Sequence, residues 1–520
     1  MPERLLIVGW DGADWEILDD LVRRGAMPNL RAMLESGARG TLASTIPTHS
    51  WAAWPTFLTG LHPSGHGVYD FIERNPARPD HRVPASSRSI RAPTFLRRIS
   101  DAGFDVRAGN VPLTFPPTPL RGRMISGVLV PDGTEFVFPP AWRAELEANA
   151  PFPVNGLGWQ LFERRQRALL REALELIEAR TASFELLLQG EWQVGVCVYV
   201  EPDRLQHPFG AYVLPSHPAH ERLADRPIAD DLRAVYSALD RALDRLASAS
   251  GNDTTVVLMS DHGFRPITRV ADTNAVLEHV GFAKRHAGAP VRAALRRSKR
   301  LRGATRTSFG RALARAIRPV SGVTRASTRA YESVAGGGIS IALEGRERHG
   351  TVPASAYECV RSELAEALLG YRDAETGNRI VAEVLTREDL PPGPYDPLAP
   401  DLIAIPAPLW AFGNTDAISS ATNWPTGSHR RSGVLLASDG VSGHDLGERF
   451  VGDLAPTALA FCGLSADGLD GEVIDPLVGS PHLRGGARRA SEPPGADPVE
   501  PSARENEEMI QRLRELGYVD

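Results

Sequence analysis

Residues 254–264 read TTVVLMSDHGF, an apolar run rich in β-branched side chains that ends at the adjacent pair Asp261 and His262. A short run of this composition predicts a strand that is buried on both faces, as in a parallel sheet covered by helices. Both polar side chains would be costly to bury without partners, so their place at the strand end favours a role as ligands over a role in packing.

Two other apolar runs end in the same way. Residues 5–12 (LLIVGWDG) end at Asp11, and residues 194–203 (VGVCVYVEPD) end at Asp203. Because ligand sites in open α/β sheets lie where strands end and loops begin, polar side chains at these positions are candidate ligands.

Helical periodicity separates the predicted strands, most clearly over residues 161–188 and 228–247. Alternating strands and helices indicate a mostly parallel sheet with helices on its faces. We therefore predict an α/β protein, a three-layer α/β/α sandwich with a mostly parallel central sheet and an inserted cap.

The composition excludes several classes of protein. Of the 520 residues, 42% are hydrophobic, which is enough for a sizeable core and excludes a disordered chain. The three cysteines, Cys197, Cys359 and Cys462, lie far apart, which excludes a disulfide scaffold and fits a reducing compartment. No apolar run approaches the roughly 20 residues of a membrane span, and the N-terminus lacks the pattern of a signal peptide. We expect a cytoplasmic protein.

The charge of the chain is unevenly distributed. Between Glu278 and Glu332 there are 14 Lys or Arg residues, from Lys284 to Arg329, and no Asp or Glu. Three interpretations remain open for this basic segment: a lid with its arginines in solvent, a lid whose basic face attracts a phosphorylated substrate, or an interfacial helix on anionic lipid. Nucleic acid is disfavoured because the segment is nearly free of aromatic residues that could stack on bases.

Composition shifts divide the chain into five units. We expect residues 1–278 to form the first part of a catalytic core, 279–331 a basic inserted cap, and 332–478 the second part of the core. Residues 479–504, rich in Gly, Pro and Ala, predict a flexible linker, and residues 505–520 a short C-terminal helix.

Six side chains are candidate metal ligands. Asp11 precedes a glycine, although a turn or helix-cap role is the alternative. Asp203 and His207 stand four apart, which places them on one face if the segment is helical; a cap Asp and an exposed His are the alternative. His429, in a Gly/Ser loop, reads by itself as a surface histidine. With Asp261 and His262 they make three Asp and three His, a set that suits Zn²⁺ or Mn²⁺ and is large enough for two ions.

A nucleophile is expected before a helix-like run in residues 44–67. Ser50 and Thr48 lie where a phosphate oxygen would meet the free amides of a helix N-terminus. A hydroxyl that contacts a metal ion loses its proton more easily. The alternative for Ser50 is a simple helix N-cap.

The order of these motifs resembles the alkaline phosphatase superfamily, in its type I phosphodiesterase/nucleotide pyrophosphatase branch, and within it a group of predicted phosphohydrolases or phosphomutases. The resemblance runs from Leu5 to about Ile474. The motifs that carry it are GWDGADW, IPTHS with TGLHPSGHGVYDF, GNVPLTFPP, EPDRLQH, SDHGF, GRERHGTV, APDLI, GSHRRSGVLL and GDLAPTAL.

The resemblance implies a metal-dependent phosphoester hydrolase with two divalent ions per chain, Zn most often and Mn as the alternative. The family's nucleophile lies nine residues before the Thr of Thr59-Gly60, which gives Ser50 and a covalent phosphoserine intermediate. One ion would be held by Asp11, Ser50, Asp261 and His262, and the other by Asp203, His207 and His429. The substrate would be a phosphorylated small molecule or lipid.

Two positions depart from the family pattern. Pro55 comes later than the usual proline and is expected to kink the helix that Ser50 begins. Phe71 stands where nucleotide pyrophosphatases place an Asn that holds the substrate phosphate. Arg74, Arg265 and Arg430 lie near the motifs, where they could assist the reaction, but we expect each to be an ordinary solvated arginine.

Two alternative functions remain open at these residues, and two others are excluded. A phosphomutase or phosphotransferase would use the same site, and a non-catalytic binding protein would be expected to lack a ligand. A sulfatase is excluded because Ser50 is not followed by its x-Pro-x-Arg signature, and a membrane transferase because no span is present.

Overall fold

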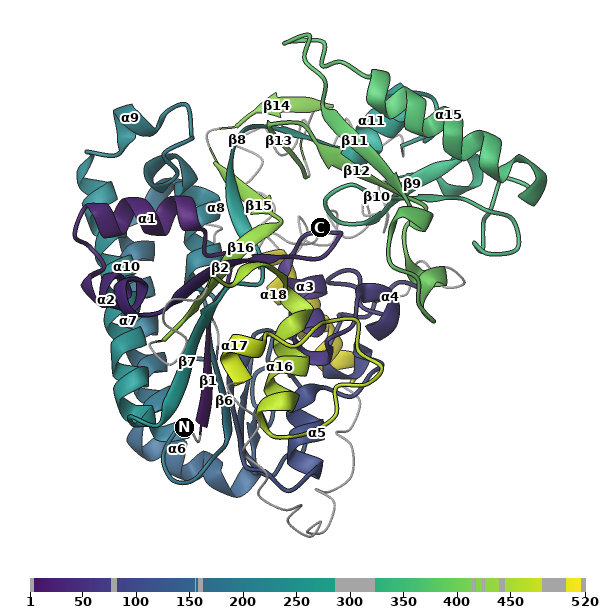
Figure 1. The fold of residues 1–520 in the computed structure, drawn as a ribbon. Helices are drawn as coiled ribbons and strands as arrows, with labels where there is room; N and C mark the ends of the chain where they lie inside the picture. Colours follow the sequence, from purple (N-terminus) through teal and green to yellow (C-terminus); the bar gives the residue numbers. More distant parts are fainter. Residues whose placement is uncertain are drawn as a thin grey trace.

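The computed structural model describes residues 4–75, 82–154, 156–157, 162–285, 323–413, 415, 418–422, 424, 426–438, 445–478 and 502–515. Its largest element is a nine-stranded sheet with the order β17–β2–β16–β7–β1–β6–β3–β4–β5 (Figure 1). The strands are β1 Arg4–Trp10, β2 Ala38–Ala43, β3 Val106–Val111, β4 Gly122–Ser126, β5 Val137–Phe138, β6 Val194–Tyr199, β7 Thr254–Met259, β16 Ser432–Ala437 and β17 Gly447–Phe450.

The centre of this sheet is parallel. Strand β1 pairs with β6 in the register Leu5↔Val194 and with β7 in the register Leu5↔Thr255, and β3 continues the parallel order beside β6. Strands β16 and β5 are antiparallel to their neighbours. Every residue of β6 is buried, which is the pattern expected of a strand covered on both faces.

Helices cover both faces of the sheet, with α1, α2, α7 and α10 on one side and α3, α5, α16 and α17 on the other (Figure 1). Their bounds are α1 Trp15–Arg23, α2 Pro28–Ser36, α3 Ser50–Thr59, α5 Phe95–Asp101, α7 Phe162–Leu187, α10 Pro227–Ser250, α16 Leu454–Phe461 and α17 Asp475–Val478. The predicted three-layer α/β/α fold with a mostly parallel sheet is thus confirmed. The remaining helices of the core are short α4 Pro63–His66, α6 Arg143–Asn149 and α9 His220–Leu223, together with α8 Glu201–Val213.

A second, antiparallel sheet forms the cap, in the order β11–β12–β10–β9. It packs with helices α11 (Thr273–His279) and α15 (Tyr357–Gly370) around a separate hydrophobic cluster that includes Leu364 and Trp410. The strands are β9 Ala330–Val334, β10 Gly338–Ile341, β11 Val381–Thr386 and β12 Leu402–Pro406.

The cap is therefore larger than the sequence predicts. The composition assigns residues 332–478 to the core, whereas β9 to β12 build a sheet of their own. Short strands carry no sequence signal for the sheet that they join, because their pairing depends on residues far away in the chain.

One strand connects the two parts. Strand β8 (Gly263–Ala271) begins directly after His262 and pairs first with β15 (Gly427–Arg430) and further along with β13 (Leu409–Phe412) and β14 (Ser419–Ala421). In Figure 1, β8 and β15 rise from the edge of the large sheet towards the cap.

Several predictions concern residues that are only partly described. Most of the basic segment (residues 286–322) and most of the predicted linker (479–501) lie outside the described residues. The predicted C-terminal helix overlaps α18 (Ala503–Glu515), whose Met509 and Leu513 are buried against the core. Among the helices that the structure describes, none combines the length and the apolar composition needed to span a bilayer.

Candidate active site

Asp11 directly follows β1, where the chain turns sharply. Its backbone N–H donates to the carbonyl of Tyr199 on β6, and Gly12 adopts a positive φ of 70°. A Cβ at position 12 would lie 3.2 Å from the Cα of Asp203. The glycine is thus required by its backbone conformation and by the close approach of α8, which brings Asp11 beside Asp203.

Ser50 is the first residue of α3, and its hydroxyl faces the ends of the parallel strands. Its Oγ donates to Asp11 Oδ1 over 3.1 Å and lies 3.2 Å from His262 Nε2. The N-cap position belongs to His49, so Ser50 is not a simple cap. The helix runs through Pro55 to Thr59.

Thr48 is less suited to be the nucleophile. Its hydroxyl donates to the carbonyl of Thr45 over 2.7 Å, and its own carbonyl lies 3.2 Å from His429 Nδ1. Both polar groups of Thr48 thus contribute to holding the loop and the histidine in place.

The first group of candidate ligands surrounds Ser50. Asp11 Oδ2 accepts a hydrogen bond of 2.9 Å from Trp54 Nε1, and Asp261 Oδ1 accepts one of 3.1 Å from the backbone N–H of Gly12. His262 Nε2 lies 3.5 Å from Asp261 Oδ2 and 3.7 Å from Asp11 Oδ1. Three acidic or imidazole groups and a hydroxyl thus converge on one small volume.

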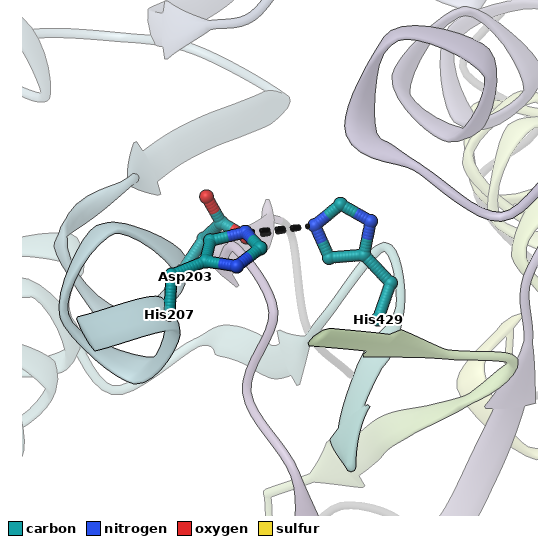
Figure 2. A group of neighbouring side chains, drawn as sticks. All are labelled: Asp203, His207 and His429. Carbon is teal, nitrogen blue, oxygen red and sulfur yellow. Dashed lines mark hydrogen bonds and ion pairs between the residues drawn. The ribbon is translucent and has the colours of Figure 1, made fainter. Parts of the chain in front are cut away.

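The second group joins α8 to β15 (Figure 2). Asp203 Oδ1 lies 3.4 Å from His207 Nε2 and 3.3 Å from His429 Nε2. The Nδ1 atom of His207 lies 3.1 Å from the carbonyl of Gly427, and that of His429 contacts Thr48. Backbone carbonyls at Nδ1 orient both rings so that Nε2 points at Asp203, which is the usual support of a metal-binding histidine.

Asp203 belongs to both groups. The resemblance assigns it to the ion held by His207 and His429, and the structure also groups it with Asp11 and His262, whose Nε2 lies 4.0 Å from Asp203 Oδ1. The two groups are therefore contiguous through Asp203.

The electrostatics of the site fit bound cations. Burial raises the pKa of Asp11 and raises that of Asp261 to about 7, and in both cases neighbouring carboxylates add to the effect. Burial lowers the pKa of His262 and of His207. Asp261 Oδ2 is buried and makes no hydrogen bond to the residues described. Carboxylates crowded against neutral imidazoles are the donor set that a divalent ion stabilises.

The arginines near the motifs are paired with protein groups and are not simply solvated. The side chain of Arg74 is largely buried; it donates to the carbonyls of Leu398 and Ala399 and pairs with Glu347. The prediction that these arginines are ordinary solvated side chains is therefore wrong for Arg74, because the cap covers it.

The other two arginines flank His429 and are also partnered. Arg265 donates through Nε to the carbonyl of His429 over 3.1 Å. Arg430 pairs with Asp14, a buried carboxylate that sequence reasoning missed. The only signal for Asp14 was its place in GWDGADW, three residues after Asp11.

Position 71 provides packing in place of a polar group. The Phe71 ring stacks on His49 with ring centroids 5.4 Å apart and packs against Trp51 at 4.6 Å. The neighbouring Asp70 accepts from the backbone N–H of Ala335 in the cap over 3.0 Å. This loop thus connects the core to the cap, and position 71 has no side-chain amide that could bind a phosphate.

Comparison with known proteins agrees with this geometry. Residues 5–430 match the model of the type I phosphodiesterase/nucleotide pyrophosphatase family. A structure of phosphonoacetate hydrolase from Sinorhizobium meliloti 1021 in complex with phosphonoacetate is 18% identical, with 84% of this chain and 90% of that chain covered and a TM-score of 0.52.

A second similar structure, human ectonucleotide pyrophosphatase/phosphodiesterase 5, is 14% identical, with 90% of this chain and 97% of that chain covered and a TM-score of 0.51. At these identities the likeness shows a shared fold. A comparison with curated proteins found no significant match. The family match spans most of the sequence, and the chain accordingly belongs to the type I phosphodiesterase/nucleotide pyrophosphatase family, a family of phosphoester hydrolases.

Proposed function

We propose that this enzyme hydrolyses phosphoesters at a two-ion site with Ser50 as its nucleophile. The observation that carries the proposal is the position of Ser50 Oγ, between Asp11 Oδ1 at 3.1 Å and His262 Nε2 at 3.2 Å at the start of α3. Divalent ions held by the two ligand groups would polarise the phosphoryl oxygens and make a hydroxyl more acidic.

The proposed reaction has two steps, transfer of the phosphoryl group to Ser50 and its hydrolysis by water. The Ser50 hydroxyl loses its proton to solvent, and its oxygen attacks phosphorus. The bond from phosphorus to the leaving oxygen breaks, and that oxygen takes a proton from water. The N-terminus of α3 carries a partial positive charge that stabilises the phosphoryl group on Ser50. Water then cleaves the phosphoserine and regenerates the hydroxyl.

The donor set supports Zn²⁺ first and Mn²⁺ second, because it combines imidazoles with carboxylates. The substrate class is a phosphorylated small molecule or lipid. Phe71 offers no hydrogen bond where nucleotide pyrophosphatases place an Asn, so we do not assign a nucleotide substrate. A phosphomutase or phosphotransferase reaction would use the same groups.

The test uses metal-free protein reconstituted with Zn²⁺ or Mn²⁺ and assayed with a chromogenic phosphodiester and a phosphomonoester. We expect activity that requires the ion and that depends on Ser50, and acid quenching during turnover of the monoester should trap phosphate on Ser50. Protein that binds well under one ion per chain and stays inactive after addition of either metal would overturn the proposal. A mutase would release little product from the diester.

The basic segment 284–329 is proposed to attract the phosphorylated substrate or an anionic membrane surface. At its two described ends, Arg285 pairs with Glu278 and Arg329 pairs with Glu363. Deletion of residues 286–322 should then change the substrate preference and its salt dependence. Kinetics that are unchanged at low and high salt would favour a lid with solvated arginines.

A further inference from the structure

Asp14 is a fully buried carboxylate that none of the proposed chemical steps uses. It caps α1, where Oδ1 accepts from the backbone N–H of Glu16 over 2.8 Å. It also contacts two segments more than 200 residues away in sequence, Phe264 and Arg430. A side chain needed only to cap a helix would not require these distant partners.

The first distant contact fixes the segment that carries Asp261 and His262. Asp14 Oδ2 accepts from the backbone N–H of Phe264 over 2.9 Å. A Cβ on Gly263 would lie 2.4 Å from the same oxygen and 2.0 Å from the carbonyl of Ser432. Gly263 is thus the residue that lets Asp14 approach the chain directly after His262.

The second distant contact fixes the segment that carries His429. The guanidinium of Arg430 pairs with Asp14 Oδ1 and lies 3.8 Å from Glu16. In the β8–β15 ladder, Arg430 is opposite Gly263 and His429 is opposite Phe264. Asp14 therefore contacts both strands of the ladder, β8 at Phe264 and β15 at Arg430.

Ser260, directly before Asp261, makes a similar connection to the loop after β1. Its Oγ donates to the carbonyl of Ala13 over 2.8 Å and accepts from the backbone N–H of Val434 over 2.7 Å. Ser260 thus ties the loop after β1 to the end of β7 and the start of β16, and Asp14, the next residue of the loop, ties it to β8 and β15.

We infer that Asp14 is a positioning residue that holds the ligand group of Asp11, Asp261 and His262 at a fixed separation from His429. The inference rests on the proposed two-ion site. The negative charge is needed for the pair with Arg430. An Asn in its place has one acceptor oxygen, so it can still accept from Phe264 but no longer accepts from Arg430 and Glu16 at the position of Oδ1. Removing the carboxylate should therefore release β15 first and loosen His429.

The direct test is metal binding by the metal-free full-length protein, titrated with Zn²⁺ against a chromogenic chelator. In Asp14→Asn and in Arg430→Met we expect the affinity for one of the two ions to fall by about 10- to 100-fold, as is typical when a residue that supports a ligand is removed. The double variant should be no worse than either single variant, because both remove the same interaction. Losses that add, or wild-type affinity for both ions in Asp14→Asn, would overturn the inference.

The matched control is Asp240→Asn. Asp240 is also a buried carboxylate of the core and accepts from the backbone N–H groups of Asn29 and Leu30, away from the site. We expect it to lower thermal stability without changing the affinity for either ion. If Asp240→Asn lowered the affinity for one ion as much as Asp14→Asn does, the effect would be general destabilisation and the inference would fail.

A second measurement needs no metal. In the metal-free protein, amide hydrogen exchange at residues 428–431 should be faster in Asp14→Asn than in wild type, and unchanged in Asp240→Asn. Equal exchange in wild type and Asp14→Asn would overturn the inference even if the protein bound no ion. Wild-type protein that fails to bind metal would instead overturn the proposed function, so the two failures are distinguishable.

Discussion

The Nε2 atoms of His207 and His429 lie 3.1 Å apart, although 222 residues separate the two histidines in sequence. Each ring has its Nδ1 at a backbone carbonyl, so both Nε2 atoms are directed at the same point beside Asp203. Two protonated rings could not share this position without strong repulsion. The arrangement is suited to two neutral imidazoles around one cation.

His429→Ala should reduce the bound metal from two ions per chain to one. The variant removes one of the three groups around the second ion position and leaves Asp11, Asp261 and His262 in place. The measurement is the metal content of reconstituted protein after dialysis. His220→Ala, which removes a buried histidine of α9, should keep both ions. Full metal content in His429→Ala would contradict the assignment.

Ser50→Ala should lower kcat/KM by about 10⁴-fold or more, the scale seen when a catalytic nucleophile is removed. Metal binding should weaken less, because the carboxylates and imidazoles remain. Thr48→Ala serves as the comparison, since among the described residues its hydroxyl donates to the carbonyl of Thr45 and has no other partner. A larger loss in Thr48→Ala than in Ser50→Ala would transfer the role of nucleophile to Thr48.

Trp54→Phe should weaken metal binding through Asp11. Its indole N–H donates to Asp11 Oδ2 over 2.9 Å and so fixes the direction of the other carboxylate oxygen. Trp192 is the matched control, because it is equally buried and donates to the carbonyl of Leu188 over 2.8 Å. Both substitutions should cost about 1–3 kcal/mol of unfolding free energy.

Only Trp54→Phe should change the zinc affinity, measured by competition with a chelator. If Trp192→Phe weakened zinc binding to the same extent, the indole of Trp54 would have no specific role in orienting Asp11.

Glu332→Gln should stabilise the protein increasingly as the pH rises. Burial raises the pKa of Glu332, on β9 of the cap, to about 8, and Thr273 donates to its carboxylate over 2.8 Å. Because the folded pKa exceeds the usual value of about 4.3, the wild type loses stability between pH 4.3 and 8, while the glutamine variant does not titrate.

The measurement is the urea midpoint of both proteins from pH 4 to 9. Glu366→Gln, at an exposed position of α15, should follow the wild type at every pH. A constant difference between Glu332→Gln and wild type over this range would show that the pKa of Glu332 is not raised.

The core of the fold was predictable because its strands are long, apolar and continuous. The apolar runs before Asp11, Asp203 and Asp261 are β1, β6 and β7, and the helical periodicity of residues 161–188 and 228–247 corresponds to α7 and α10. Parallel strands that share an edge bring their ends together, so the same pattern also located most of the candidate ligands.

The contacts of Asp14 were not predictable for a physical reason. As a helix cap it is locally satisfied, so its sequence context gives no sign of Arg430 or of the backbone of Phe264. The extent of the cap was hidden in the same way, because β9 to β12 are short and their partners are set by tertiary pairing. Local patterns identify elements, whereas long-range pairs decide how elements are joined.

Strand β8 has a consequence for protein engineering. Its first residues follow His262 and pair with the strand that carries His429, and its last residues pair with β13 and β14 of the cap. A chimera that took the cap from a relative by cutting within β8 would therefore also disturb the spacing of the two histidines. Exchange of substrate preference between family members should succeed when the junctions lie beyond Ala271 and before Leu409, where the donor cap leaves the shared strand intact.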